Sequence, residues 1–101
     1  MNEKENNLLE HEESRININF TSKEVMDVTY KGRVARFGGE LGLHEFMADI
    51  DSARWLCPKE GTKMTQREKE EVISAVCKHY HHKIIRVFFC DKNYNVIYST
   101  R

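Results

Sequence analysis

Residues 25–39 read VMDVTYKGRVARFGG, and this stretch predicts the fold class. Apolar and polar side chains alternate in VMDVTY, which is typical of a half-buried strand, and RVARF follows as a second strand. Between them, Lys31-Gly32 suits a tight turn, because glycine accepts the positive φ that two-residue hairpin turns require. The stretch therefore predicts an antiparallel hairpin that ends at Gly38-Gly39.

The segments on either side of this hairpin show the same period-two pattern. RININF, residues 15–20, places its three apolar side chains on one side of a strand. HEFMADI, residues 44–50, also alternates, so its carboxylates share the face opposite to that of Phe46. The first half of the chain is therefore predicted to form an antiparallel meander with one solvent-exposed face.

A helix is predicted after this meander. Thr65 and Glu68 form a T-x-x-E capping box, whose side chains satisfy free amides of the first helical turn. Apolar residues recur at helical spacing from Val72 to Tyr80, and carboxylates precede lysines and histidines along the helix, as the helix dipole favours. Two further strands are predicted in IIRVFFC and VIYST, joined by a turn at DKNYN.

The expected element order is β-β-β-β-α-β-β, which gives an α+β fold with an antiparallel sheet packed against one main helix. A chain of 101 residues can build one core, so residues 15–101 are expected to form a single domain. Residues 1–14 carry few apolar side chains and are expected to form an acidic N-terminal arm. The following residues are expected to be buried, with Trp55 at the edge of the core: Phe37, Phe46, Ile50, Val72, Val76, Ile85, Val87 and Phe89.

Composition narrows the functional class. No apolar run approaches the roughly twenty residues of a membrane span, and the N-terminus is acidic where a signal peptide is basic, so a cytoplasmic protein is expected. The three cysteines are widely spaced and are interpreted as small buried hydrophobic residues rather than a disulfide framework. The formal net charge is zero. Direct nucleic-acid binding is therefore not expected, because such proteins usually carry a basic excess.

The densest stretch is residues 38–55, GGELGLHEFMADIDSARW. Its glycines lie between predicted strands and lack the Lys-Ser/Thr pair of a phosphate-binding loop, so we expect them to bend the sheet or to allow a bulge. The stretch also carries four carboxylates: Glu40, Glu45, Asp49 and Asp51. Glu45, Asp49 and Asp51 are expected to share one strand face by parity, and one strand cannot supply the converging oxygens of a hard-cation site. We interpret these carboxylates as a solvated face or as a patch that meets a basic partner.

No catalytic constellation is recognised in the sequence. The serines lack a G-x-S-x-G elbow, and no cysteine lies beside a histidine in a known motif. His79 is expected to share a helix face with His82, and Cys77 with His81, but no C-x-x-C or H-E-x-x-H accompanies them, and cationic side chains suit a helix C-terminus. We therefore expect no enzymatic activity, no metal and no cofactor. A small metal-dependent hydrolase that uses the carboxylates and histidines is the alternative.

The order of these features resembles a known family. A strand containing INF is followed by VTYKGR, a strand ending in FGGEL, EFMADIDSARW, a loop with Pro58 and a T-x-x-E-K helix. This pattern, from about Ile16 to Phe89, is similar to small α+β immunity proteins that bacteria encode beside polymorphic toxins, including toxins of contact-dependent growth inhibition. The resemblance implies a cytoplasmic protein without catalysis that binds and neutralises one cognate toxin C-terminal domain. It assigns no contact residues.

The charge distribution suggests which surface meets that partner. Residues 1–60 carry twelve carboxylates against eight bases, and residues 61–101 carry four against eight. If the toxin is a basic nuclease, Glu40, Glu45, Asp49 and Asp51 are the expected contacts, because complementary charge speeds association and sets partner choice. The rival surface is the basic second part of the chain, which would meet an acidic toxin. A regulatory module that binds nucleic acid through this basic part is a further alternative.

Overall fold

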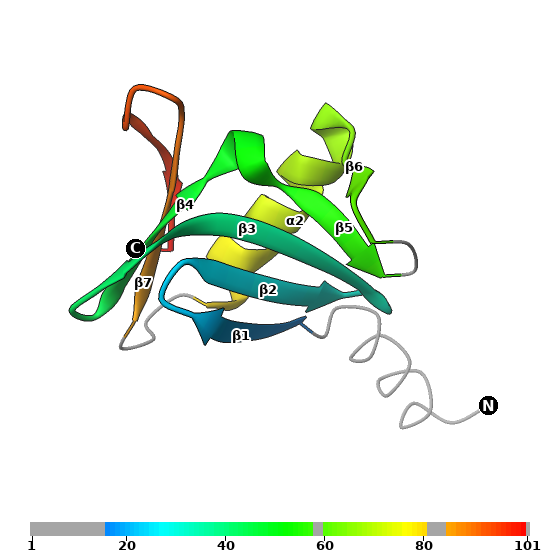
Figure 1. Ribbon diagram of the computed structural model, residues 1–101, viewed down its shortest axis with the longest axis horizontal. Coiled ribbons are helices and arrows are strands. Elements are labelled where there is room, and N and C mark those ends of the chain that lie inside the picture. Colours follow the sequence, from blue (N-terminus) through cyan, green and yellow to red (C-terminus); the bar gives the residue numbers. More distant parts are fainter. Residues whose placement is uncertain (1–15, 58–59, 81–84, 101) are drawn as a thin grey trace.

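The computed structural model describes residues 16–57, 60–80 and 85–100. The predicted arm at residues 1–14 and the histidines at positions 81 and 82 lie outside these ranges. Over these ranges the fold is α+β, a mixed eight-stranded sheet with one α-helix packed against it (Figure 1). The elements are β1 (Ile16–Ser22), β2 (Val25–Tyr30), β3 (Arg33–Gly42), β4 (Glu45–Asp49), the 3-10 turn η1 (Ile50–Ser52), β5 (Arg54–Cys57), β6 (Thr62–Lys63), α2 (Gln66–His79), β7 (Arg86–Cys90) and β8 (Val96–Ser99).

β3 is the longest strand and joins two halves of the sheet. Its first part pairs with β2, from Arg33 to Gly38, and with β5, while Gly39 to Gly42 pair with β4. We call β1, β2, the first part of β3, β5 and β6 the first half-sheet. The second half-sheet consists of the last part of β3, β4, β7 and β8. Figure 1 shows β3 arching across the molecule between the two.

The predicted bend at the glycine pair lies where the two half-sheets meet. A Cβ on Gly39 would overlap the carbonyl oxygen of Met47 and lie 2.8 Å from Cε2 of Phe46, so the neighbouring strand packs directly on the bare backbone. The preceding glycine, Gly38, donates its N–H to Oγ of Ser52 at 2.8 Å. β4 and β5 pair with successive parts of β3, and η1 lies between them. At this gap, the bond to Ser52 takes the place of a strand partner. A glycine is therefore needed at position 39 because the backbone of β4 approaches it closely, and not because its φ is positive.

One pairing departs from the predicted antiparallel sheet. β4 and β7 run parallel, with Phe46 opposite Val87 and Ala48 opposite Phe89. Parallel neighbours need a long crossover connection, and β5, β6 and α2 together supply it. β5 and β6 were not predicted, because the short segment after Ala53 shows no alternation long enough to indicate a strand. The remaining β2–β3, β1–β2, β3–β4 and β7–β8 pairings are antiparallel, as predicted.

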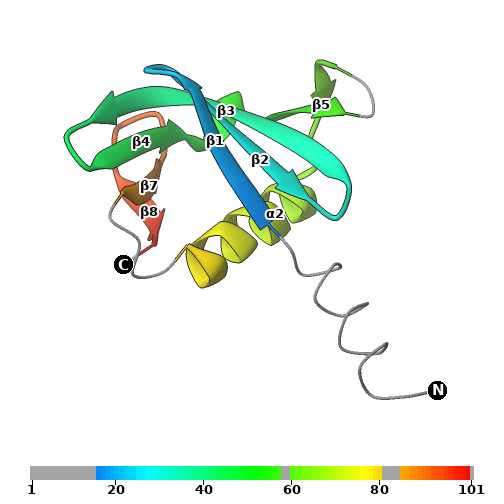
Figure 2. The same ribbon diagram turned by 90° about the horizontal axis from the view of Figure 1, so that it is seen from below.

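The core lies between the inner face of the sheet and α2, which occupies one side of the sheet (Figure 2). Six of the expected core residues are buried: Phe37, Phe46, Val72, Val76, Val87 and Phe89. Ile50 and Ile85 are only half-buried, since Ile50 lies in η1 rather than in a strand and Ile85 precedes β7. Trp55 is 3% exposed and belongs to the core itself rather than to its edge.

The structure confirms the predicted hairpin turn and the predicted start of the helix. Both residues of the Lys31-Gly32 turn have positive φ, 52° and 76°, as a type I′ hairpin turn requires. At the start of α2, the N–H of Glu68 donates to Oγ1 of Thr65, and the N–H of Thr65 donates to the Glu68 carboxylate. Within the described ranges, no helix has the length and apolar character needed to cross a membrane.

Candidate functional site

The outer face of the second half-sheet collects most of the predicted carboxylates. In the register of the strands, Glu40 on β3 lies opposite Met47 on β4, and Met47 lies opposite Phe88 on β7. Residues opposite one another project from the same face, and Glu45 and Asp49 share that face because strand side chains alternate. We call Glu40, Glu45, Met47, Asp49 and Phe88 the acidic face. It lies on the side of the sheet opposite to the buried residues that pack on α2.

The composition of the acidic face is that of an exposed surface with an apolar centre. Glu40, Glu45 and Asp49 are exposed, while Met47 and Phe88 are half-buried between them. Neither the Glu40 nor the Glu45 carboxylate makes a hydrogen bond or ion pair with any other described residue. Arg86 lies opposite Glu45 in the register and is exposed on the same side of the sheet, but no ion pair joins the two side chains. These two carboxylates therefore have no structural role that the described residues reveal.

The other two predicted carboxylates differ from this pair. We had placed Asp51 on the same strand face as Asp49, and this prediction is wrong, because the strand ends at Asp49 and Asp51 lies in η1. Asp49 caps η1: its Oδ1 accepts the N–H of Asp51 at 2.9 Å. Its carboxylate thus has a structural task in addition to its charge. Asp51 is exposed at the border of the face.

A hollow of about 340 Å³ adjoins the acidic face at the end of β4. Glu40, Asp49 and Asp91 bring three carboxylates to its lining, against the single ammonium group of Lys92. Asp91 accepts hydrogen bonds from the backbone N–H groups of Asn93 and Asn95 and from the side-chain amide of Asn95. The Asn95 bonds are the main cause of the lowered pKa of Asp91, so this carboxylate stays charged to lower pH than usual.

The aromatic residue at the mouth of this hollow is unusual. Tyr94 is 82% exposed and has φ of 64°, a left-handed conformation that bulky side chains rarely adopt. Its N–H donates to the carbonyl of Asp91 at 3.1 Å, which closes the turn between β7 and β8. A glycine or asparagine would satisfy this turn with less strain. Fold stability alone therefore does not account for a tyrosine here.

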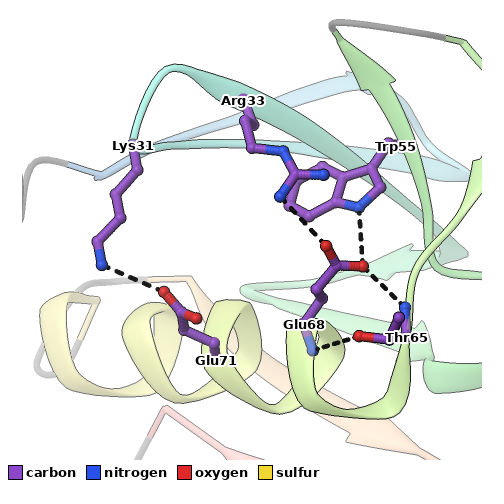
Figure 3. Close-up of polar contacts among 6 residues, drawn as sticks. All are labelled: Lys31, Arg33, Trp55, Thr65, Glu68 and Glu71. Carbon is purple, nitrogen blue, oxygen red and sulfur yellow. Dashed lines mark hydrogen bonds and ion pairs between the residues drawn. The ribbon is translucent and has the colours of Figure 1, made fainter.

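The polar residues of the first half-sheet form a different kind of cluster, shown in Figure 3. The guanidinium carbon of Arg33 lies 3.6 Å from the centre of the Trp55 ring, and Nη1 of Arg33 contacts Oε2 of Glu68 at 3.2 Å. Nε1 of Trp55 donates to Oε1 of Glu68 at 3.3 Å. The backbone bond from Thr65 is the main cause of the lowered pKa of Glu68, with the Trp55 bond second. This cluster ties the sheet to the first turn of α2.

Two further ion pairs satisfy the first half-sheet. Nζ of Lys31 lies 3.3 Å from Oε2 of Glu71 on α2. Arg36 and Asp27 lie opposite each other on β3 and β2 and form a two-pronged pair, with bonds of 2.8 and 2.9 Å. The hydrogen bond to Asp27 is the main cause of the raised pKa of Arg36. Lys31, Arg33 and Arg36 therefore contribute to cohesion, whereas the exposed Arg54 and Lys63 of β5 and β6 make no ion pair with a described residue.

The metal and thiol candidates gain no support from geometry. Among the described residues, no three His, Cys, Asp or Glu side chains converge in a way that would hold a metal ion. His79 is exposed at the end of α2, and the rest of the histidine cluster lies outside the described ranges. Cys90 is buried, as expected, whereas Cys77 is half-buried. Burial raises the pKa of both thiols, which disfavours the reactive thiolate.

Sequence reasoning missed two parts of this surface. Phe88 joins the acidic face only through the parallel β4–β7 pairing, which no local pattern revealed. Tyr94 lies in the segment DKNYN, which was predicted as a turn without attention to its aromatic residue. A large aromatic side chain among turn-forming residues was the available signal. Compared with protein families, curated proteins and solved structures, the chain shows no match.

Proposed function

We propose that this protein is a bacterial immunity protein that acts in the cytoplasm, where it binds and neutralises a cognate toxin domain through the acidic face. The observation that carries the proposal is the pair Glu40 and Glu45, exposed carboxylates that flank a half-buried apolar centre and have no partner among the described residues. Protein interfaces combine such an apolar centre with a charged or polar rim. The sequence resemblance to immunity proteins supports the same function.

The chemistry of the face suits a basic partner. A nuclease toxin presents cationic side chains where it holds phosphate groups, and carboxylates on an inhibitor occupy the same positions as those phosphates. Complementary charge steers association, while apolar contacts at Met47 and Phe88 slow dissociation. The contact is therefore expected to be protein–protein, with no direct role for nucleic acid or membrane.

The test is coexpression with the product of the neighbouring gene, followed by a binding measurement and a growth-protection assay. The informative variant is Glu40→Gln with Asp49→Asn, because asparagine retains the cap on η1 while both charges are lost. We expect binding to weaken at least about tenfold, which corresponds to about 1.4 kcal/mol. Protection from the toxin should fall in parallel, and the thermal unfolding midpoint should stay close to that of the wild type.

The matched control replaces two exposed carboxylates outside the face, Glu60→Gln with Glu70→Gln, and should leave binding unchanged. The rival surface, the basic second part of the chain, is tested by Arg67→Gln with Lys78→Gln, two exposed residues of α2 that lie away from the acidic face. If the rival variant loses protection while the acidic-face variant retains it, the acidic face is not the contact surface. If the neighbouring gene product does not bind the wild-type chain, the proposed function itself is wrong.

A further inference from the structure

β8 forms one end of the sheet, and its outer edge pairs with no other described strand. The N–H of Thr100 donates to the carbonyl of Val87 on β7 at 3.0 Å. Because the N–H groups of a strand point alternately to its two sides, the N–H of Ser99 is directed away from β7. The outer edge of β8 therefore presents backbone donors and acceptors that can pair with another strand.

The side chains of this edge are apolar and exposed. Val96 and Ile97 are 52% and 51% exposed, and Tyr94 in the preceding turn is exposed further. Charged residues, proline or a covering element normally protect a sheet edge, and β8 carries no charge. At the opposite edge, β1 exposes Asn17 and Asn19 while its apolar side chains pack against the core. Contiguous apolar exposure of this kind marks interaction surfaces.

We propose that the outer edge of β8 receives an extended segment of a basic partner protein, which adds a strand to the second half-sheet. Backbone hydrogen bonds would hold such a segment, and its apolar side chains would cover Val96 and Ile97. The inference rests on the proposed function, because it takes the acidic face as part of the same contact surface. Val96 lies opposite Cys90, which lines the hollow together with Asp49, so the edge and the acidic surface adjoin.

Two arguments favour a basic partner over a second copy of this chain. Pairing of two four-residue strands covers far less area than the roughly 1,200–2,000 Å² of a stable interface. A two-fold β8–β8 pairing would also continue the sheet with both acidic faces on the same side. Their carboxylates would then repel one another, whereas basic residues that flank an added segment would meet Glu40 and Asp49 favourably.

The probe is a capped peptide of alternating valine and threonine with arginine at both ends, and the matched control peptide has glutamate in those places. Each is titrated into the isotope-labelled full chain and followed by NMR. We expect amide shifts concentrated in β8 and the turn before it, and slower exchange of the Ser99 N–H. The arginine peptide should bind at least about threefold more tightly than the glutamate peptide.

Variants of Ile97 and Glu40 test whether the peptide binds at the edge of β8. Ile97→Lys places a charge on the edge and should abolish the shifts, whereas Ile97→Thr keeps a β-branched side chain and should retain pairing. Both are expected to fold, because Ile97 is half exposed. Glu40→Gln should remove most of the preference for the arginine peptide without preventing β8 from pairing.

Three results would overturn the inference: no β8 shifts with either peptide, equal affinity for both, or a concentration-dependent dimer that Ile97→Lys dissociates. The outcome is separable from that of the proposed function. If Ile97→Lys protects cells fully while the acidic-face variant does not, the edge proposal fails and the acidic-face contact stands. If the arginine peptide binds β8 but the neighbouring gene product does not bind the chain, the proposed function fails and the edge proposal stands.

Discussion

The two half-sheets share one strand, β3, but the described ion pairs all lie in the first half-sheet and its contacts with α2. In the first half-sheet, Arg33, Arg36 and Lys31 are each paired with a carboxylate on a neighbouring strand or on α2. In the second, the carboxylates of Glu40 and Glu45 have no partner among the described residues. Charges that are satisfied internally hold a fold together, and charges left exposed around an apolar centre are available for a partner. The comparison separates a half whose paired charges contribute to the fold from a half that we propose to bind a partner.

The aromatic residues show the same contrast. Trp55 in the first half-sheet is buried, stacked under Arg33 and hydrogen-bonded to Glu68. Tyr94 in the second is exposed and held in a left-handed conformation. A buried aromatic residue with a satisfied polar group stabilises the folded state, whereas an exposed and strained one contributes little to it.

The largest expected effect on stability is the difference between substitutions of Trp55 and of Tyr94. Trp55→Ala should lower the free energy of unfolding by about 3–5 kcal/mol, because it leaves a cavity and removes the support of the Arg33–Glu68 pair. Tyr94→Ala should change it by less than about 0.5 kcal/mol. Urea denaturation of both variants provides the measurement. Equal losses in the two variants would contradict the inference that Trp55 stabilises the fold and Tyr94 does not.

The next largest effect is expected at Gly39, where the two half-sheets meet. Gly39→Ala should cost about 1–3 kcal/mol, because the new methyl group would overlap the Met47 carbonyl and force β3 and β4 apart. Gly38→Ala is the matched control: its methyl group would meet Oγ of Ser52 at 3.4 Å, an ordinary contact. Chemical denaturation should show the control within about 0.5 kcal/mol of the wild type. A comparable loss in both variants would mean that the close approach is not specific to Gly39.

The smallest effect tests whether charge contributes to the sheet–helix cluster. Folding lowers the pKa of Glu68, so its charge stabilises the folded state above the ordinary value of 4.5, and that contribution disappears as the pH falls through the lowered folded pKa. Glu68→Gln keeps a capping side chain but removes the charge. The stability difference between wild type and variant should be fully present at pH 7 and vanish below the folded pKa. Unfolding curves at a series of pH values measure this, and a difference that does not change with pH would show that charge plays no part.

The carboxylates illustrate how far sequence could predict the candidate site. Alternation in residues 44–50 correctly placed Glu45 and Asp49 on one face, because side-chain direction in a strand depends only on parity. Asp51 was misplaced because η1 breaks that parity after Asp49. Local bonds to Asp49 shape η1, and the N–H of the distant Gly38 donates to Ser52 and ties η1 to β3. Phe88 was missed for a related reason. It joins the acidic face through the parallel pairing of β4 with β7, two strands that lie far apart in the sequence.

The sequence by itself determined the features that depend on neighbouring residues. Period-two alternation specified β1, β2 and β4, Gly32 allowed the hairpin turn, and the Thr65–Glu68 capping box specified the start of α2. Only the tertiary structure decided the parallel β4–β7 pairing, the change of partner along β3 and the full burial of Trp55. The physical reason is that alternation and capping depend on residues that lie close together in the sequence. Strand partners and burial, in contrast, are chosen by contacts between segments far apart in the chain, and no local pattern encodes them.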